Sequence, residues 1–124
     1  MSCSSCSGTP STIVYSCSGA ADVGEISDRV ARGLSREGIG KMSCAVGMGA
    51  GVQSLRNAAL SAGRILAIDG CATRCVAKAL AESGVTEYVH VELGSLGFGK
   101  GASPATDDNV AKASEMARQK LVAA

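Results

Sequence analysis

Cysteine is the residue of this 124-residue chain best suited to chemistry, because thiolates bind soft metal ions, exchange disulfides and act as nucleophiles. Two of the six cysteines form a Cys-x-x-Cys pair near the N-terminus and four are spread over the chain: Cys3, Cys6, Cys17, Cys44, Cys71 and Cys75. Free cysteine is also a small hydrophobic residue of protein cores. The positions of the six in the fold must therefore decide between these uses.

The composition narrows the class of protein. Twelve basic residues nearly balance eleven acidic ones, and the two signs are interspersed. This pattern argues against nucleic acid and against a polybasic membrane anchor as partners, and it names no protein partner. The N-terminus lacks the basic and apolar regions of a signal peptide, and no apolar run approaches a membrane span. We therefore expect a cytoplasmic protein with reduced thiols, in which metal ligation or thiol chemistry is favoured over a disulfide framework.

Strand and helix patterns alternate along the chain. Short β-branched or alternating runs predict strands over residues 12–15, 41–46, 64–69 and 87–93. Apolar spacings of three and four, together with capping residues, predict helices over residues 23–34, 52–62, 73–83 and 106–122. The glycine-rich segment 47–51 is expected to be a loop.

This order predicts an α/β fold. Strand–helix alternation implies a parallel sheet with helices on both faces and right-handed crossovers. We expect a Rossmann-like three-layer sandwich with a four-stranded parallel sheet in the order 2-1-3-4. Residues 1–11 would form a flexible head, and residues 12–124 a single metal-binding domain.

Three cysteines fall at equivalent places in this fold. Cys17 follows the first predicted strand, Cys44 ends the second and Cys71 follows the third. These strand ends share one edge of the sheet, where neighbouring strands lie about 4.8 Å apart. Cys75 lies four residues after Cys71, so both would share one face of the third helix. Four thiolates gathered there could close a tetrahedral site with Zn–S bonds of about 2.3 Å.

The same residues carry a family resemblance. Asp69-Gly70-Cys71 followed by Cys75, the segment 17–25 that opens on Cys17, and Cys44 before a glycine-rich segment are similar to motifs of the DGC domain family, whose members are proposed zinc-binding proteins. The likeness covers nearly the whole chain and includes the Cys-x-x-Cys head. It implies zinc as the bound metal, with Cys17, Cys44, Cys71 and Cys75 as its ligands.

Two further features concern the surroundings of such a site. Cys3 and Cys6 could fold over the sheet edge and add two ligands, which would make the site binuclear. Asp69 could act as a carboxylate that supports the ligands from outside, or it could be a turn residue that binds nearby backbone amides.

Other candidates have simpler interpretations. Gly47, Gly49 and Gly51 lack the spacing of a phosphate loop, and we interpret them as a plain turn. His90, the only histidine, could be a solvent-facing strand residue or a neighbour of the metal site, and we favour the solvent-facing interpretation. Cys17 stands where a phosphatase-like nucleophile would stand, but Val23 occupies the position of the required arginine.

Three functions remain open at this point. The first is a zinc-binding protein, which we expect not to be an enzyme because four thiolates leave no open coordination position. The second is a thiol redox enzyme or sulfur carrier that uses Cys17 or Cys71. The third is an iron–sulfur protein, since four cysteines also suit such clusters.

Overall fold

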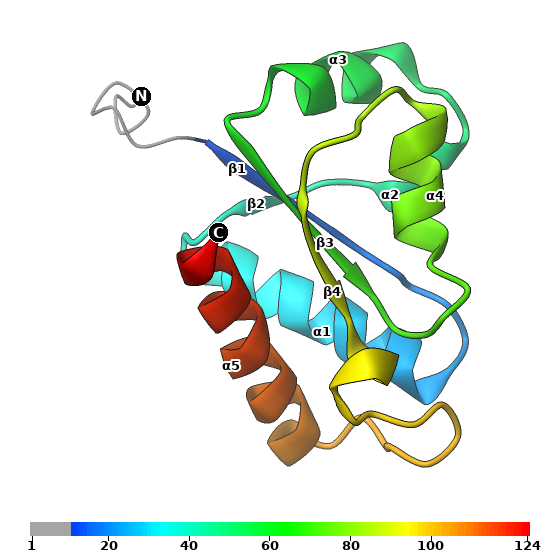
Figure 1. Ribbon diagram of the computed structural model, residues 1–124, viewed down its shortest axis with the longest axis vertical. Helices are drawn as coiled ribbons and strands as arrows, with labels where there is room; N and C mark the ends of the chain where they lie inside the picture. The colour runs from blue at the N-terminus through cyan, green and yellow to red at the C-terminus, as the bar shows by residue number, and fades with distance from the viewer. Residues whose placement is uncertain (1–10) are drawn as a thin grey trace.

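Four parallel strands form the centre of the structure, a computed structural model that describes residues 11–124 (Figure 1). The strand order is β2-β1-β3-β4, as the sequence predicts. The strands are β1 (Thr12–Ser16), β2 (Lys41–Met42), β3 (Arg64–Asp69) and β4 (Val89–Glu92). The predicted head, apart from Ser11, lies outside the described residues.

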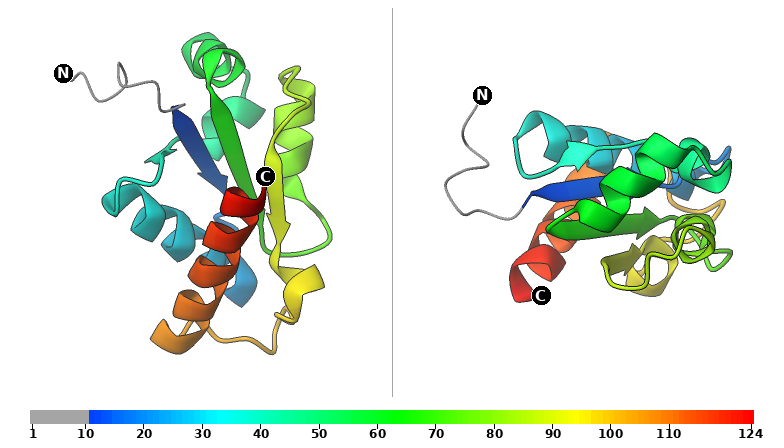
Figure 2. Two further views of the ribbon diagram at one scale, coloured as in Figure 1. Left: turned by 60° about the vertical axis from the view of Figure 1, so that its left-hand side comes forward. Right: turned by 90° about the horizontal axis from the view of Figure 1, so that it is seen from above.

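Helices cover both faces of this sheet, which confirms the predicted three-layer α/β arrangement (Figures 1 and 2). The helices are α1 (Asp22–Arg36), α2 (Ala45–Gly49), α3 (Gln53–Ser61), α4 (Cys75–Glu82), the 3₁₀ helix η2 (Leu93–Leu96) and α5 (Asp107–Ala123). Helices α1 and α5 pack on one face, and α2, α3 and α4 pack on the other. None of the helices in residues 11–124 is both long and apolar enough to cross a bilayer.

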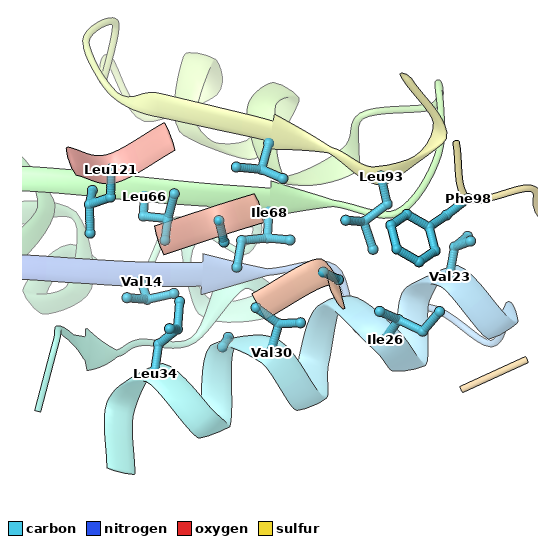
Figure 3. Close-up of a cluster of buried hydrophobic side chains, with 14 residues drawn as sticks. Val14, Val23, Ile26, Val30, Leu34, Leu66, Ile68, Leu93, Phe98 and Leu121 are labelled. Carbon is cyan, nitrogen blue, oxygen red and sulfur yellow. The ribbon is translucent and has the colours of Figure 1, made fainter. Parts of the chain in front are cut away.

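Alternate residues of the two central strands supply two separate cores. Val14, Leu66 and Ile68 are fully buried against α1 and α5 (Figure 3). Tyr15 and Ala67 are fully buried on the opposite face, beneath α2, α3 and α4. Strands that are buried on both faces read as continuous apolar runs, which is why β1 and β3 are recognisable in the sequence.

Helix α1 ends as its glycine predicts. Gly38 has a φ of 79°, and the amides of Gly38 and Ile39 donate to the carbonyls of Ser35 and Leu34. This pair of bonds is a Schellman motif, which satisfies carbonyls that the end of the helix would leave unpaired. The helix therefore stops at a defined point, and the chain turns back into β2.

The second predicted strand is mostly wrong. Only Lys41 and Met42 pair with β1, and the segment 45–49, part of which was expected to be a loop, is the short helix α2. Cys44 is the N-cap of this helix, and its Sγ accepts a hydrogen bond from the Gly47 amide at 3.2 Å. The cysteine side chain thus starts a helix at the point where the apolar pattern would extend the strand.

The third predicted helix begins later than expected. Helix α4 starts at Cys75, after Arg74, which adopts a left-handed conformation with a φ of 56°. A left-handed residue interrupts helical geometry, so Cys71 lies outside the helix. The fourth strand is also shorter than predicted, because the chain turns into η2 at Leu93.

Gly70 lets two segments meet closely where β3 ends. A Cβ atom at this position would lie 2.8 Å from both the carbonyl carbon and the oxygen of Val23, which are backbone atoms of α1. Backbone cannot move aside as a flexible side chain can. Glycine is therefore required here so that the start of α1 can pack against the β3–α4 connection.

Replacing Gly70 with alanine should lower the free energy of unfolding by about 1–3 kcal/mol, because the new methyl group overlaps the backbone of α1. Gly33→Ala is the matched control, since a Cβ at Gly33 meets no atom within 4 Å. That change should raise stability by about 0.5–1 kcal/mol through helix propensity. Urea unfolding of both variants measures the two effects, and equal changes would contradict the close-approach argument.

Candidate thiol site

The carboxyl edge of the sheet collects the cysteines of the described chain. Cys17 follows β1, Cys44 follows β2 and Cys71 follows β3, and these strands are neighbours in the sheet. Cys17 and Cys71 therefore follow their strands as predicted, whereas Cys44 lies beyond the end of β2 and not within the predicted strand. None of the four described cysteines forms a disulfide, and all four are at least partly exposed.

Three of the cysteines line one cavity of about 1380 Å³, which extends from this edge along β2 to the start of that strand. Cys17, Cys44 and Cys75 all line it, from the β1–α1 connection, the start of α2 and the start of α4. Cys71 does not line this cavity. The expectation that Cys71 and Cys75 share a helix face is wrong, because Arg74 breaks the helical path between them.

The side chains of this edge do not converge on one point. Within residues 11–124, no three Cys, His, Asp or Glu side chains stand close enough to hold one metal ion as they are arranged. Cys3 and Cys6, which we considered as additional ligands, lie outside the described residues. The donor types suit a soft metal, but the spacing seen in this part of the chain does not close a four-ligand site.

Backbone amides donate to two of the sulfurs at the strand ends. Cys17 Sγ accepts from the Gly19 amide at 3.4 Å, and Cys44 Sγ accepts from the Gly47 amide at 3.2 Å. In both cases the donor lies two or three residues further along the chain. These local hydrogen bonds orient each sulfur relative to its own segment.

The neighbours of Cys71 lower the pKa of its thiol. Hydrogen bonds from the Thr73 hydroxyl and the Thr73 amide lower the pKa of the Cys71 thiol, and the positive charge of Lys100 acts in the same direction. Partial burial and the negative charge of Asp69 oppose this shift. A larger fraction of Cys71 is therefore thiolate at neutral pH than for an ordinary cysteine.

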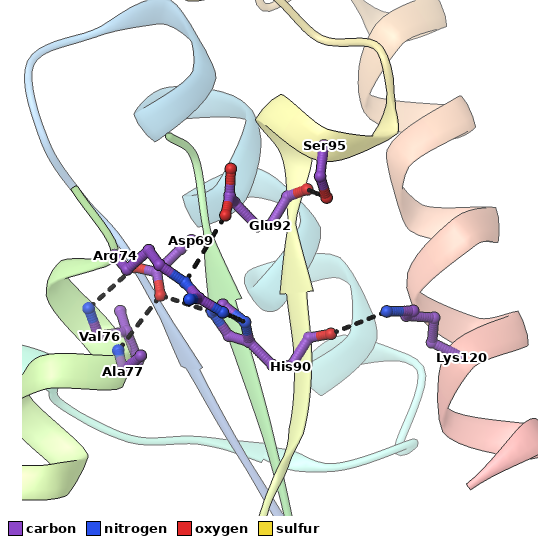
Figure 4. A network of polar contacts seen from close by, with 8 residues as sticks. All are labelled: Asp69, Arg74, Val76, Ala77, His90, Glu92, Ser95 and Lys120. Atoms are coloured by element: carbon purple, nitrogen blue, oxygen red, sulfur yellow. Dashed lines mark hydrogen bonds and ion pairs between the residues drawn. The ribbon is translucent and has the colours of Figure 1, made fainter. Parts of the chain in front are cut away.

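Asp69 ties together the elements around Cys71 (Figure 4). Its buried carboxylate accepts the amides of Val76 and Ala77 at 2.8 and 3.2 Å, which satisfies the first turn of α4. The same carboxylate lies 2.8 Å from His90 Nε2 on β4. Of the two interpretations of Asp69, the structure thus shows the one in which its oxygens bind backbone amides.

The strand pattern predicted a solvent-facing His90, and this prediction is wrong. Its side chain is only 16% exposed, and it is held between Asp69 and Arg74, whose guanidinium lies 3.1 Å from Nδ1. Arg74 donates to Nδ1, so Nε2 carries the proton that is shared with Asp69. Arg74 also lies 3.6 Å from a carboxylate oxygen of Glu92, which completes the network drawn in Figure 4.

Sequence reasoning missed these partners because none of them belongs to a motif. His90 and Glu92 lie two residues apart on β4 and therefore on one face of the strand, and that spacing is the signal that could have found them. Arg74 gives no such signal, because a left-handed arginine before a helix is not expected from its residue type.

Comparison with known proteins gives a family match. The model of the DGC domain matches residues 13–117. The protein "Anaerobic and virulence modulator AnvM" of Pseudomonas aeruginosa is 37% identical over 91 residues, which cover 73% of this chain and 70% of the relative. No solved structure matches the chain.

Replacing Thr73 with valine should raise the apparent pKa of the Cys71 thiol, because the hydroxyl that stabilises the thiolate is lost. The rate of alkylation of Cys71 by iodoacetamide, followed against pH by peptide mass spectrometry, measures this pKa. The pH at which alkylation reaches half its maximal rate should rise towards the ordinary cysteine pKa of about 8.5. Thr86→Val, an exposed change outside the site, is the control and should leave the profile in place.

Replacing Asp69 with alanine should destabilise the fold by about 2–4 kcal/mol, because two amides of α4 and the His90 ring lose a buried, charged acceptor. Asp107→Ala is the matched control, since that carboxylate is almost fully exposed and pairs only with a surface arginine. Thermal unfolding of both variants compares them. A loss no larger at Asp69 than at Asp107 would show that the network contributes little.

Proposed function

Because this chain belongs to the DGC domain family, we propose that it is a metal-binding protein that takes a thiophilic ion, zinc first, at the carboxyl edge of its sheet. The ligands are Cys17, Cys44, Cys71 and Cys75. The proposed function is non-catalytic, since a closed four-thiolate site leaves no position for a substrate.

One observation carries this proposal: Cys17, Cys44 and Cys75 line a single cavity although they come from the β1–α1 connection, the start of α2 and the start of α4. Cysteines used only as small hydrophobic residues would be buried separately in the two cores. Here Cys44 and Cys75 are exposed, and Cys17 is half-buried. Exposed thiols that face one cavity are typical of a ligand-binding site.

Metal binding requires the sulfurs to move closer together than they lie in the described residues. The segments that carry them suit such a movement, because Cys17, Cys44 and Cys71 stand in connections rather than within helices or strands. Binding energy and folding energy are coupled when an ion draws its ligands together. Cys3 and Cys6 stay second-tier ligands in the proposal and would make the site binuclear.

A second candidate function is thiol redox chemistry or sulfur transfer at Cys71, and the lowered pKa of its thiol favours it. The relative AnvM is named an anaerobic and virulence modulator. A modulator of anaerobic life is compatible with thiolates whose oxidation depends on oxygen. In this alternative Cys71 would react alone, and the cavity cysteines would hold no ion.

Elemental analysis of the full chain, purified without added metal or chelator, tests the two candidates. We expect about one zinc per chain, and a chelator should lower the thermal stability of the protein. Two zinc ions would bring Cys3 and Cys6 into the site, and iron with inorganic sulfide would replace zinc with a cluster. Absence of metal, with one unusually reactive thiol at Cys71, would contradict the metal proposal and favour thiol chemistry.

Variants assign the ligands. Cys17→Ser, Cys44→Ser and Cys75→Ser should each release the metal. A chelator should then no longer lower the thermal stability of these variants. Ser54→Ala on the exposed side of α3 is the control and should retain the full metal content. Metal retained in all three cysteine variants would place the ligands elsewhere in the chain.

A further inference from the structure

The cavity lined by Cys17, Cys44 and Cys75 is much larger than a metal site needs. Its volume of about 1380 Å³ would hold a molecule of many atoms, and small-molecule sites usually measure about 300–1,000 Å³. The three cysteines account for only a part of its wall. The remaining wall carries polar, charged and apolar groups that the metal proposal does not use.

A buried hydroxyl on this wall lacks a partner. Ser16, the last residue of β1, lines the cavity and is 2% exposed, and its Oγ makes no hydrogen bond within residues 11–124. A buried hydroxyl that is left unpaired destabilises the folded protein. Most such groups in proteins are paired, so an unpaired one on a cavity wall indicates a place where a bound molecule would supply the partner.

The charges on the wall favour an anion. Arg32, Arg36 and Lys41 line the cavity, and Asp28 is the one carboxylate among its lining residues in the described chain. Asp28 is already engaged, because it lies 2.8 Å from Arg32 Nε and accepts the Ser18 hydroxyl at 3.0 Å. Within residues 11–124, neither Arg36 nor Lys41 forms a salt bridge, so both are available to a negative ligand.

Another part of the wall is apolar. Met42 from β2, Leu55 from α3 and Val76 from α4 line it, and Val46 of α2 is 77% exposed beside them. Together with Met42 and Leu55, the exposed Val46 forms an apolar part of the wall beside the cations Arg36 and Lys41. A body of hydrocarbon or aromatic character would cover these side chains.

We propose that this cavity binds a small organic anion with an apolar body, whose acid group pairs with Arg36 and Lys41 and whose body covers Met42, Leu55 and Val46. The Ser16 hydroxyl supplies a polar contact within the cavity. Acid groups of the carboxylate and phosphate classes share this chemistry. The site goes beyond the proposed metal function and needs no metal ion, although both would use the same cavity.

Fluorescence titration with anilinonaphthalene sulfonate, an aromatic anion, tests this site on the full folded chain. We expect saturable binding of about one probe per chain, weaker at higher salt because the contact to the acid group is ionic. Arg36→Glu should weaken binding at least about fivefold through charge reversal. Lys112→Glu, an exposed change on α5 with the same change in net charge, is the matched control and should leave the affinity unchanged.

Ser16→Ala separates ligand contact from structure. Because the hydroxyl is unpaired, its removal should keep or raise the thermal stability, while the affinity for the probe falls. Circular dichroism checks that each variant is folded, since partly unfolded proteins also bind this dye. Absence of saturable binding, equal effects of Arg36→Glu and Lys112→Glu, or unchanged affinity in Ser16→Ala would each overturn the proposal.

Displacement of the probe identifies the acid. Octanoate and octyl phosphate carry the same apolar body, so the stronger competitor shows whether the site prefers a carboxylate or a phosphate, and failure of both to displace the probe would contradict the proposed ligand class. The titration is repeated on protein of known metal content and after chelation. Bound metal without probe binding would contradict the anion site and leave the metal proposal intact. Probe binding without metal would support the anion site and contradict the metal proposal.

Discussion

The arrangement of the carboxyl edge depends on the hydrogen bonds that the buried Asp69 carboxylate accepts. It sits at the end of β3, fully buried, and holds the first amides of α4 on one side and the ring of His90 on the other. A buried carboxylate is tolerated only when its oxygens are satisfied, and here three donors surround it. One side chain thus fixes the direction of α4 and joins β3 to the face of β4.

Gly70 and Cys71 follow Asp69 directly, so their places are set by the end of β3. Gly70 allows the backbone of α1 to approach at 2.8 Å from where a Cβ would lie, so α1 and α4 begin at the same edge. Cys71 then emerges beside Thr73 and Lys100, which stabilise its thiolate. The Asp-Gly-Cys triplet is therefore a structural unit in which each residue type answers a different demand: acceptor, close approach and thiol chemistry.

The sequence predicts the sheet well because its central strands are buried on both faces, and continuous apolar runs such as Ile65 to Ile68 have few alternatives. It predicts the places of Cys17 and Cys71 for the same reason, since strand ends follow from strand order. The sequence-based prediction fails where a single residue determines the course of the backbone. Cys44 caps a helix, and a left-handed Arg74 delays another; neither event leaves a periodic signal. His90 was misjudged because its partner, Asp69, is distant in sequence.

The separation of Cys71 from the cavity bears on how the edge could work. Cys17, Cys44 and Cys75 line one cavity, whereas Cys71 does not line it and its thiolate is stabilised by its own neighbours. If an ion bound all four thiols, Cys71 would have to approach the cavity that the other three line. Arg74 lies between Cys71 and Cys75 in the chain and contacts His90 and Glu92, so a movement of this segment would reach those contacts. Occupation of the thiol site would then be coupled to the Asp69 network, because Arg74 and Asp69 hold the same histidine ring.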